Sequence, residues 1–308
     1  MTSLVFKRIR QTLANAALTA LVAVLSTGHQ NSQAQDAASL NARHTALREQ
    51  LASNQFQRPL YLESTNNSGD LKGDVYAVVN QPFSTVGPAL QGVDHWCDIL
   101  MLHLNVKYCG ASPDSPSNGL RLAVGRKYDQ PMEDAHQIDF SYTTDTANAN
   151  YLRVHLNADA GPMGTKNYRL SLEAVPLDDK RSFVHMSYAY GFGFSARMAM
   201  EAYLATIGRD KVGFSIIERK PDGTPVYIGG VRGVVERNTM RYYLAIESYL
   251  GAYHLAPAEQ TEKRLRDWHA GVERFARQLH ELDLNEYLDM KRREIARQQS
   301  GSKSNKPG

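Results

Sequence analysis

Short stretches of alternating apolar and polar residues make up the middle of the chain. Five of them lie between residues 119 and 190, separated by turn formers such as Ala160-Gly161-Pro162. Two more extended segments precede them, on either side of a turn-rich run at 66–70. Short alternating strands joined by tight turns predict an antiparallel sheet. The predicted strands are 60–64, 74–79, 120–124, 137–143, 151–157, 168–175 and 183–190.

Helical spacing of apolar residues predicts helices before, between and after these strands. Leu40, Leu47 and Leu51 repeat at helical intervals ahead of the first strand. Two short helices are expected after Pro82, the second with Asp94 as a possible N-cap. A helix over 195–207, a hairpin over 212–226 and a long helix over 231–253 follow the last strand.

The carboxyl-terminal part of the chain has a heptad-like pattern. Apolar residues recur every three or four positions from Leu265 to Leu282. Nine acidic and nine basic residues between 259 and 297 indicate a solvated, mixed-charge helix rather than a basic arm. We expect this apolar seam to pack back on the body of the protein. The alternative is a coiled coil between two copies, which would make the protein a homo-oligomer.

The first 34 residues have the pattern of a cleavable signal peptide. Lys7, Arg8 and Arg10 form a basic start, an apolar run follows at 16–25, and small residues precede a cut after Ala34. The apolar run has about half the length that a membrane-spanning helix needs, so a retained anchor is the weaker alternative. We expect a periplasmic or secreted protein with no transmembrane anchor after cleavage.

Removal of this segment changes the charge of the chain. Subtracting its three basic residues from the 35 lysines and arginines leaves 32, against 32 aspartates and glutamates. Nucleic-acid binding relies on an excess of basic charge that neutralises phosphates. The neutral mature chain therefore argues against a nucleic-acid partner. About 274 residues remain, enough for one large domain with a helical appendage.

Cys97 and Cys109 are the only cysteines in the sequence. In an oxidising compartment, so close a pair favours a disulfide. A catalytic thiol and a zinc site are weaker alternatives, because neither cysteine lies in a nucleophile motif and their spacing matches no paired-cysteine ligand pattern.

Residues 191–196 read G-F-G-F-S-A, which has the spacing of a dinucleotide-binding fingerprint, with Glu218 about 20 residues further on. The strand before it contains His185 and Ser187, whereas a nucleotide-binding strand is normally buried on both faces and apolar. We interpret the two glycines as easing a strand-to-helix corner, and we expect no cofactor.

Other catalytic signatures are missing from the sequence, which has no H-E-x-x-H, G-x-S-x-G or phosphate loop. His95 and His103 are eight residues apart and share a helix face only approximately, so we expect no metal site. Asp94, His95, Asp98 and Glu236 would support acid–base chemistry only if they converged on a cavity.

The order of these elements resembles the START-like, or helix-grip, superfamily. The likeness runs from residue 60 to 253 and rests on the strand at 74–79, the V-x-x-P-F motif of residues 79–83, Trp96, the antiparallel strands and the long helix. The resemblance implies an α+β fold in which a curved antiparallel sheet grips a long helix around a cavity for lipids or other apolar ligands.

Three segments, 94–109, 164–169 and 232–243, are similar to an uncharacterised family of exported proteobacterial proteins, which brings no known activity. The chain departs from the superfamily by an inserted helix and hairpin and by the terminal helix. The insert would leave the cavity open, fill it, or cover it as a lid. The expected parts are an N-terminal helix and linker (35–58), the helix-grip domain (59–254), the helical extension (255–299) and a disordered tail (300–308).

Aromatic and methionine side chains at 188–203 and 242–253 are suited to line an apolar pocket, with tyrosine hydroxyls to orient a ligand's polar end. A polar cluster at the start of the long helix would form an ion-pair cap or a polar anchor at the pocket mouth: Glu236, Arg237, Asn238 and Arg241. An ordinary core position is the alternative for each residue. The candidate ligand-binding residues are Trp96, Tyr188, Met198, Tyr203, Glu236, Arg241, Tyr242 and Tyr249.

The sequence thus predicts an exported α+β protein that binds or carries an apolar, lipid-like ligand. The first alternative is an enzyme of the same fold, a cyclase, hydratase or hydrolase that uses cavity histidines and carboxylates. The second is a structural or assembly protein that acts through the carboxyl-terminal helix.

Overall fold

The computed structural model describes residues 36–67, 69–112, 114–206 and 208–304. The predicted signal peptide lies outside these residues. The chain divides into two units, residues 1–46 and 47–308. In the first unit, residues 36–46 are helical, and the second begins with the short helix α2 (Arg48–Ala52). Within the described part of the chain, no helix is both long and apolar enough to cross a bilayer.

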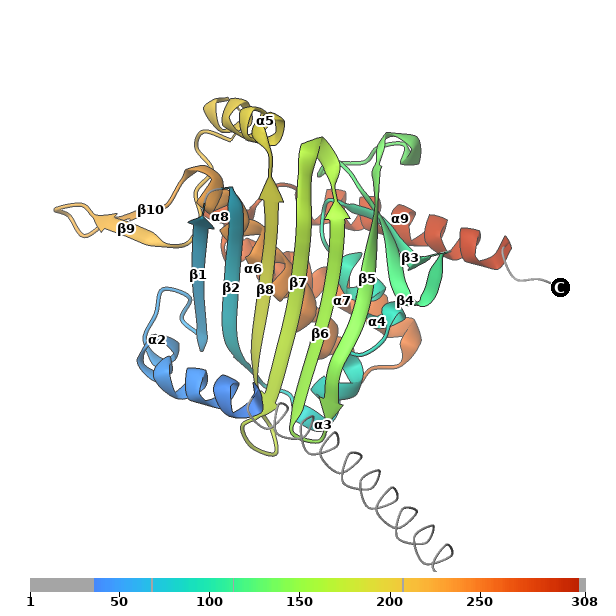
Figure 1. Ribbon diagram of the computed structural model, residues 1–308, viewed down its shortest axis with the longest axis horizontal. Coiled ribbons are helices and arrows are strands. Elements are labelled where there is room, and N and C mark those ends of the chain that lie inside the picture. The colour runs from blue at the N-terminus through green and yellow to red at the C-terminus, as the bar shows by residue number, and fades with distance from the viewer. Residues whose placement is uncertain (1–35, 68, 113, 207, 305–308) are drawn as a thin grey trace, which may run out of the picture. The chain divides into compact units, whose positions relative to one another are not determined.

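Eight antiparallel strands of the second unit form one sheet in the order β1-β2-β8-β7-β6-β5-β4-β3 (Figure 1). The predicted alternation is plain in β6, where Leu152, Val154 and Leu156 are buried and Arg153 and His155 face outward. The strands are β1 (Leu60–Asn67), β2 (Asp70–Val79), β3 (Val106–Ser112), β4 (Ser115–Val124), β5 (His136–Asn148), β6 (Tyr151–Ala160), β7 (Thr165–Pro176) and β8 (Ser182–Phe192).

Helices cover one face of this sheet, which Figure 1 shows in front of them. α3 (Phe83–Ala89) and α4 (Val93–Leu100) connect β2 to β3, and the long α6 (Gly230–Ala252) lies against β1, β2 and β8. A Cβ on Gly73 of β2 would lie only 2.2 Å from the hydroxyl oxygen of Thr239. This glycine therefore lets α6 approach the sheet closely. The predicted α+β class, with an antiparallel sheet gripping a long helix, is confirmed.

The insert between β8 and α6 consists of α5 (Phe194–Ala205) and a hairpin of β9 (Ile216–Arg219) and β10 (Pro225–Tyr227). β8 ends at Phe192 and is antiparallel to both of its neighbours. A dinucleotide fingerprint needs a parallel β-α-β unit, so the glycines at 191 and 193 form the corner that leads into α5.

The sequence pattern does not predict β3, because its alternation is broken. Lys107 stands at a position that the fold buries to 1% exposure, where an apolar residue is expected. Its ammonium group is paired with Glu294 at 3.0 Å, on a helix near the other end of the chain. A strand that depends on so distant a partner has no local signal.

The carboxyl-terminal extension is three helices rather than one: α7 (Pro257–Glu273), α8 (Ala276–Leu279) and α9 (Leu284–Ser304). α9 thus continues into the segment predicted as a tail. The breaks between these helices allow α7 to pack on α6 and α9 to pack on β3. All three belong to the same unit as the sheet.

The heptad-like seam is buried in the main core. Leu265, Trp268, Val272 and Leu279 are at most 3% exposed. The Trp268 indole donates to the carbonyl of Arg241 at 3.1 Å and stacks on Tyr287. The seam is therefore occupied within the chain and not free to pair with a second copy.

A disulfide joins Cys97 of α4 to Cys109 of β3, as predicted, with the two Cα atoms 5.1 Å apart. The two cysteines are 12 residues apart in sequence. Closing a loop of this size stabilises the fold by about 3 kcal/mol in the chain-entropy model. The disulfide links α4 covalently to β3, the strand at one edge of the sheet.

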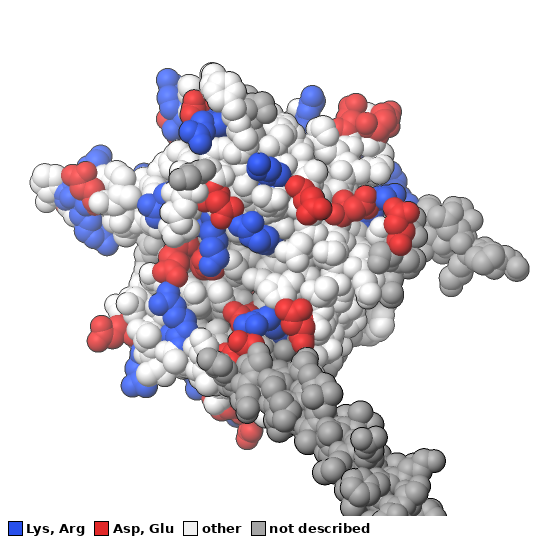
Figure 2. Space-filling model, in the orientation of Figure 1, with Lys and Arg blue, Asp and Glu red and all other residues white. Residues whose placement is uncertain are grey.

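The sheet face opposite α6 carries an ionic row across four strands. His185 lies between the carboxylates of Asp74 (2.8 Å) and Glu173 (2.9 Å), and its ring stacks on Tyr76. Arg153 pairs with the same Glu173. Figure 2 shows acidic and basic side chains interspersed over this face.

The His185 row predicts how stability depends on pH. Burial alone would lower the pKa of His185, but its hydrogen bonds to Asp74 and Glu173 raise the pKa above the ordinary value of 6.5. The imidazolium therefore contributes fully below pH 6.5, and its contribution is lost as the pH rises through the raised value. We expect His185→Gln to lower the free energy of unfolding by about 2 kcal/mol at low pH, and by much less in alkali. Urea titrations at several pH values measure this difference. The exposed His136→Gln is the control, and a His185 difference that stays constant with pH would contradict the pairing.

Candidate functional site

A cavity of about 170 Å³ lies between α6 and the strands β4 to β8. Its apolar walls come from the four neighbouring strands β4 to β7 and from α4. Its other end is polar and comes from the α4–β3 connection, β8 and α6. The lining residues are Leu100, His103, Asn105, Leu122, Val124, Ile138, Phe140, Leu156, Pro162, Tyr168, Leu170, Tyr188, Asn238 and Tyr242.

Stacked rings occupy much of the space beside this cavity. His103 stacks on Tyr242 with ring centroids 4.6 Å apart, and Tyr242 contacts Tyr188 at 5.1 Å. Tyr188 is followed by Tyr168 and Tyr190, which stack on each other at 5.4 Å. The sequence is compatible with an open or a filled cavity, and the structure shows a small cavity beside an aromatic row.

The polar end centres on His103, a side chain that is only 2% exposed. The backbone N–H of Asn105 donates to its Nδ1 at 3.1 Å. In the neutral ring the proton therefore lies on Nε2. Nε2 is buried and has no hydrogen-bond partner among the described residues. A buried donor without an acceptor costs about 1–3 kcal/mol, and the residue that carries it lines the cavity.

Burial and the surrounding cations keep this ring neutral. Burial is the largest cause that holds the pKa of His103 well below its usual range, and Arg241, Lys291, Lys127 and Lys107 add to it. The empty site therefore presents an imidazole N–H donor rather than an imidazolium.

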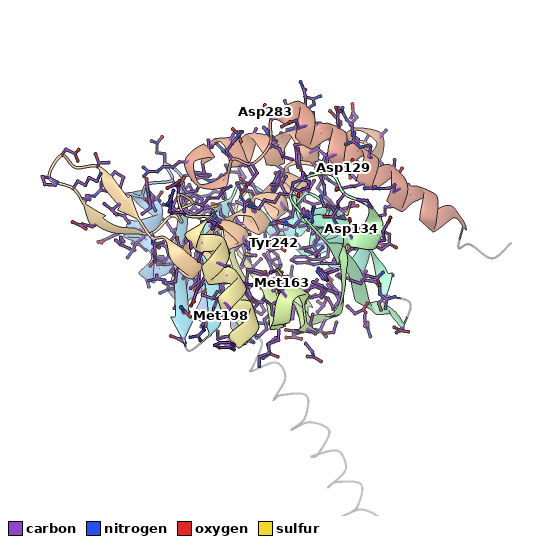
Figure 3. All side chains as sticks on the ribbon, turned by 90° about the horizontal axis from the view of Figure 1, so that it is seen from above. Asp129, Asp134, Met163, Met198, Tyr242 and Asp283 are labelled. Carbon is purple, nitrogen blue, oxygen red and sulfur yellow. A yellow bond between two sulfur atoms is a disulfide. The ribbon has the colours of Figure 1, made fainter. Side chains whose placement is uncertain are left out.

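The hydroxyls of Tyr188 and Tyr242 are further polar groups at this end. Neither makes a hydrogen bond to the described residues, and burial raises the pKa of both. They stay protonated and able to donate or accept. Figure 3 looks toward this end of the cavity, with Tyr242 near the exposed Met163 of the turn between β6 and β7.

Two groups of cations flank the polar end. Glu281 accepts hydrogen bonds from Lys127, Lys211 and Arg241. Burial alone would raise the pKa of Glu281, but Lys127 and Arg241 lower it to about 2.

The second group is buried beneath the backbone of residues 103–107. Lys107 and Lys291 share Glu294, and all three side chains are at most 1% exposed. The Lys291 ammonium also donates to the carbonyls of His103 and Val106. Burial is the main cause that lowers the pKa of Lys291, to about 8. This group fastens α9 to the segment that carries His103.

Of the residues that the sequence suggested for ligand binding, Tyr188 and Tyr242 line the cavity. Trp96 is fully buried and donates from its indole to the carbonyl of Leu90 at 2.9 Å. Tyr249 is also buried, under the guanidinium of Arg264 at 4.1 Å from the ring centroid. Trp96 and Tyr249 therefore occupy core positions away from the cavity.

Glu236 holds the insert in place instead of facing the cavity. Its carboxylate accepts hydrogen bonds from the backbone N–H groups of Phe214 and Ser215 and from the hydroxyls of Ser64 and Ser215. Arg241 binds the carbonyl of Leu279 as well as Glu281. Both residues are structural anchors on α6 in this geometry.

Met198 of α5 is 51% exposed and does not line the cavity (Figure 3). The side chain of Tyr203 lies outside the described ones. The insert therefore leaves the cavity unfilled by Met198.

The acid–base candidates do not converge. Asp98 pairs with Arg264, His95 contacts the carbonyl of Ala89, and Glu236 binds the insert. None of them lines the cavity. No group of three or more histidine, cysteine or acidic residues within the described ranges is placed to hold a metal ion.

The sequence does not point to His103 or Tyr168 as residues of a ligand cavity. His103 was considered only as a metal ligand with His95. Its helix ends at Leu100, so helical spacing does not describe its direction. Asn238, which belongs to the polar cluster predicted at the pocket mouth, lines the cavity one helical turn before Tyr242.

A larger, open groove of about 820 Å³ lies elsewhere in the same unit, between the α2–β1 connection and the α7–α8 corner. Its charged groups are largely paired, since Glu247 binds both Arg58 and Arg274. Arg277 lies over the ring of Tyr227 at 4.9 Å. The groove is open to solvent, and none of its described lining residues has a buried polar atom without a partner, so the small cavity is the better candidate site.

No protein-family model matches the sequence, and no curated protein matches it. Parts of the fold are similar to solved structures. A START superfamily protein from Mycobacterium smegmatis aligns over 44% of this chain and 91% of its own, with 11% identity and a TM-score of 0.30. A protein from Thermus thermophilus aligns over 60% and 99%, with 10% identity and a TM-score of 0.37.

Truncated norcoclaurine synthase from Thalictrum flavum aligns over 45% of this chain and 86% of its own, with 14% identity and a TM-score of 0.31. At such identities and TM-scores, neither the ligands nor the activities of these proteins are transferred to this chain.

The anchoring role of Glu236 predicts a difference between two substitutions. Glu236→Leu removes the acceptor of two backbone N–H groups, and we expect it to lower the free energy of unfolding by about 3 kcal/mol. Glu236→Gln keeps one acceptor oxygen, so the expected loss is about 1 kcal/mol. Urea unfolding measures both values, and the amides of Phe214 and Ser215 should exchange faster in the leucine variant. Equal losses, or unchanged amide exchange, would contradict this role.

Proposed function

We propose that this chain is an exported binding protein for a small, largely apolar ligand held between α6 and strands β4 to β8. The observation that carries the proposal is an apolar cavity with one buried donor, His103 Nε2, that has no acceptor among the described residues. Ligand pockets commonly combine apolar walls with a few converging polar groups.

The size of the cavity limits the size of the apolar ligand that the sequence predicts. A cavity of about 150 Å³ accepts a molecule the size of benzene, and this cavity has about 170 Å³. Drug-sized ligands occupy larger pockets. A ring-sized molecule, rather than a complete lipid, therefore fits the space.

The geometry favours binding over the two alternatives. The enzyme alternative relies on a histidine and a carboxylate that converge in the cavity, and no carboxylate is among the lining residues. Assembly through the terminal helix would need a free apolar seam, and Leu265 and Trp268 are buried within the chain.

Export is supported by the signal-peptide pattern of the first 34 residues and by the pairing of Cys97 with Cys109. The full chain expressed in a Gram-negative host should appear in the periplasmic fraction and begin at Gln35. Amino-terminal sequencing tests this cut. A cytoplasmic chain with an intact amino terminus would contradict export.

Binding is tested with benzamide, a neutral ring-sized probe with a polar end. Calorimetry should give saturable binding with one site per chain. Leu170 lines the cavity, so Leu170→Phe should fill the space and abolish binding. Leu172 is buried but outside the cavity lining, so Leu172→Phe should overpack the core and cost about 1–3 kcal/mol of stability while binding persists. Absence of binding to the unmodified chain would overturn the proposal.

A further inference from the structure

Resting on the proposed function, we infer that the natural ligand of this cavity is an anion: a small ring or short chain that carries one carboxylate. The apolar part would lie against Leu122, Leu156 and Leu170. The carboxylate would lie at the polar end, beside His103 and Asn238.

Lysine ammonium groups outnumber carboxylates around the polar end of the cavity. Among the described residues, Lys127 and Lys211 have Glu281 as their one carboxylate, and Lys107 and Lys291 have Glu294. Four ammonium groups thus share two carboxylates, before Arg241 is counted. These two groups of side chains therefore carry a net positive charge.

These positive charges act on residues of the cavity wall. Lys291 donates to the carbonyl of His103 at 3.3 Å. Arg241 donates to the side-chain oxygen of Asn238, which lines the cavity, at 3.5 Å. The same cations depress the pKa of His103, which shows that their field reaches the ring. In a site shielded from water, such a field favours a negative ligand far more than it would in solution.

The polar groups of the lining residues include several hydrogen-bond donors. The hydroxyls of Tyr188 and Tyr242 are free to donate, and His103, which lines the cavity, carries a buried donor with no acceptor among the described residues. No carboxylate lines the cavity. A carboxylate accepts several hydrogen bonds at once and binds donors more strongly than a neutral carbonyl does. Donors without acceptors in a positive field suit this group best.

The test compares benzoate with benzamide, which have nearly the same shape and differ in charge. Calorimetry at neutral pH should show benzoate binding about tenfold more tightly, or more. If benzamide binds and benzoate binds equally well or more weakly, the inference of an anionic ligand is overturned, but the proposed binding function is not. Binding of neither probe overturns both.

Two variants with the same change of charge identify the source of the preference. Lys127 is outside the cavity lining and leaves Glu281 paired with Lys211 and Arg241 when it is replaced. Lys127→Gln should weaken benzoate binding about three- to tenfold and leave benzamide unchanged. Lys220→Gln, in the turn between β9 and β10, is exposed and should change neither. An equal effect of both variants, or of Lys127→Gln on both probes, would overturn the inference.

Discussion

The packing of α6 against the sheet is the interaction on which the rest of this structure depends. Gly73 allows the helix to lie close to β2, and α6 then contacts three other parts of the chain. Glu236 binds the insert, Arg241 binds the end of α8, and the Arg241 carbonyl receives the indole of Trp268. A polar helix face that would be costly to bury alone is thereby satisfied by segments distant in sequence.

The same helix explains why the cavity has two different ends. Along the sheet, the residues that face α6 are apolar and alternate with outward polar ones, so any gap between the two layers is lined by leucine and isoleucine. At the polar end, Tyr242 and Asn238 meet the connection between α4 and β3. That connection has no regular secondary structure, and the Lys291 ammonium donates to its backbone carbonyls at His103 and Val106. The cavity lies where regular packing stops.

How much the sequence predicts differs between the fold and the site. Seven strands, the two short helices, the long helix and the disulfide follow from alternation, helical spacing and cysteine pairing, because these signals are local. β3 and the breaks between α7, α8 and α9 do not follow, since they depend on contacts such as Lys107 with Glu294. At the site, Tyr188 and Tyr242 were identifiable as aromatic residues near the glycine corner and on the long helix. His103 acquires its role only through burial and through the hydrogen bond from Asn105.

The position of α9 on β3 has a further consequence. β3 is an outer strand of the sheet, and the free N–H and C=O groups of such a strand are a template on which another chain can add a strand and aggregate. Here the side chain of Gln298 accepts the N–H of Cys109 at 3.0 Å. Lys291 takes the carbonyl of Val106. The terminal helix thus protects an edge that would otherwise be open, so a chain shortened before α9 would retain its sheet only at the risk of joining it to the sheets of its neighbours.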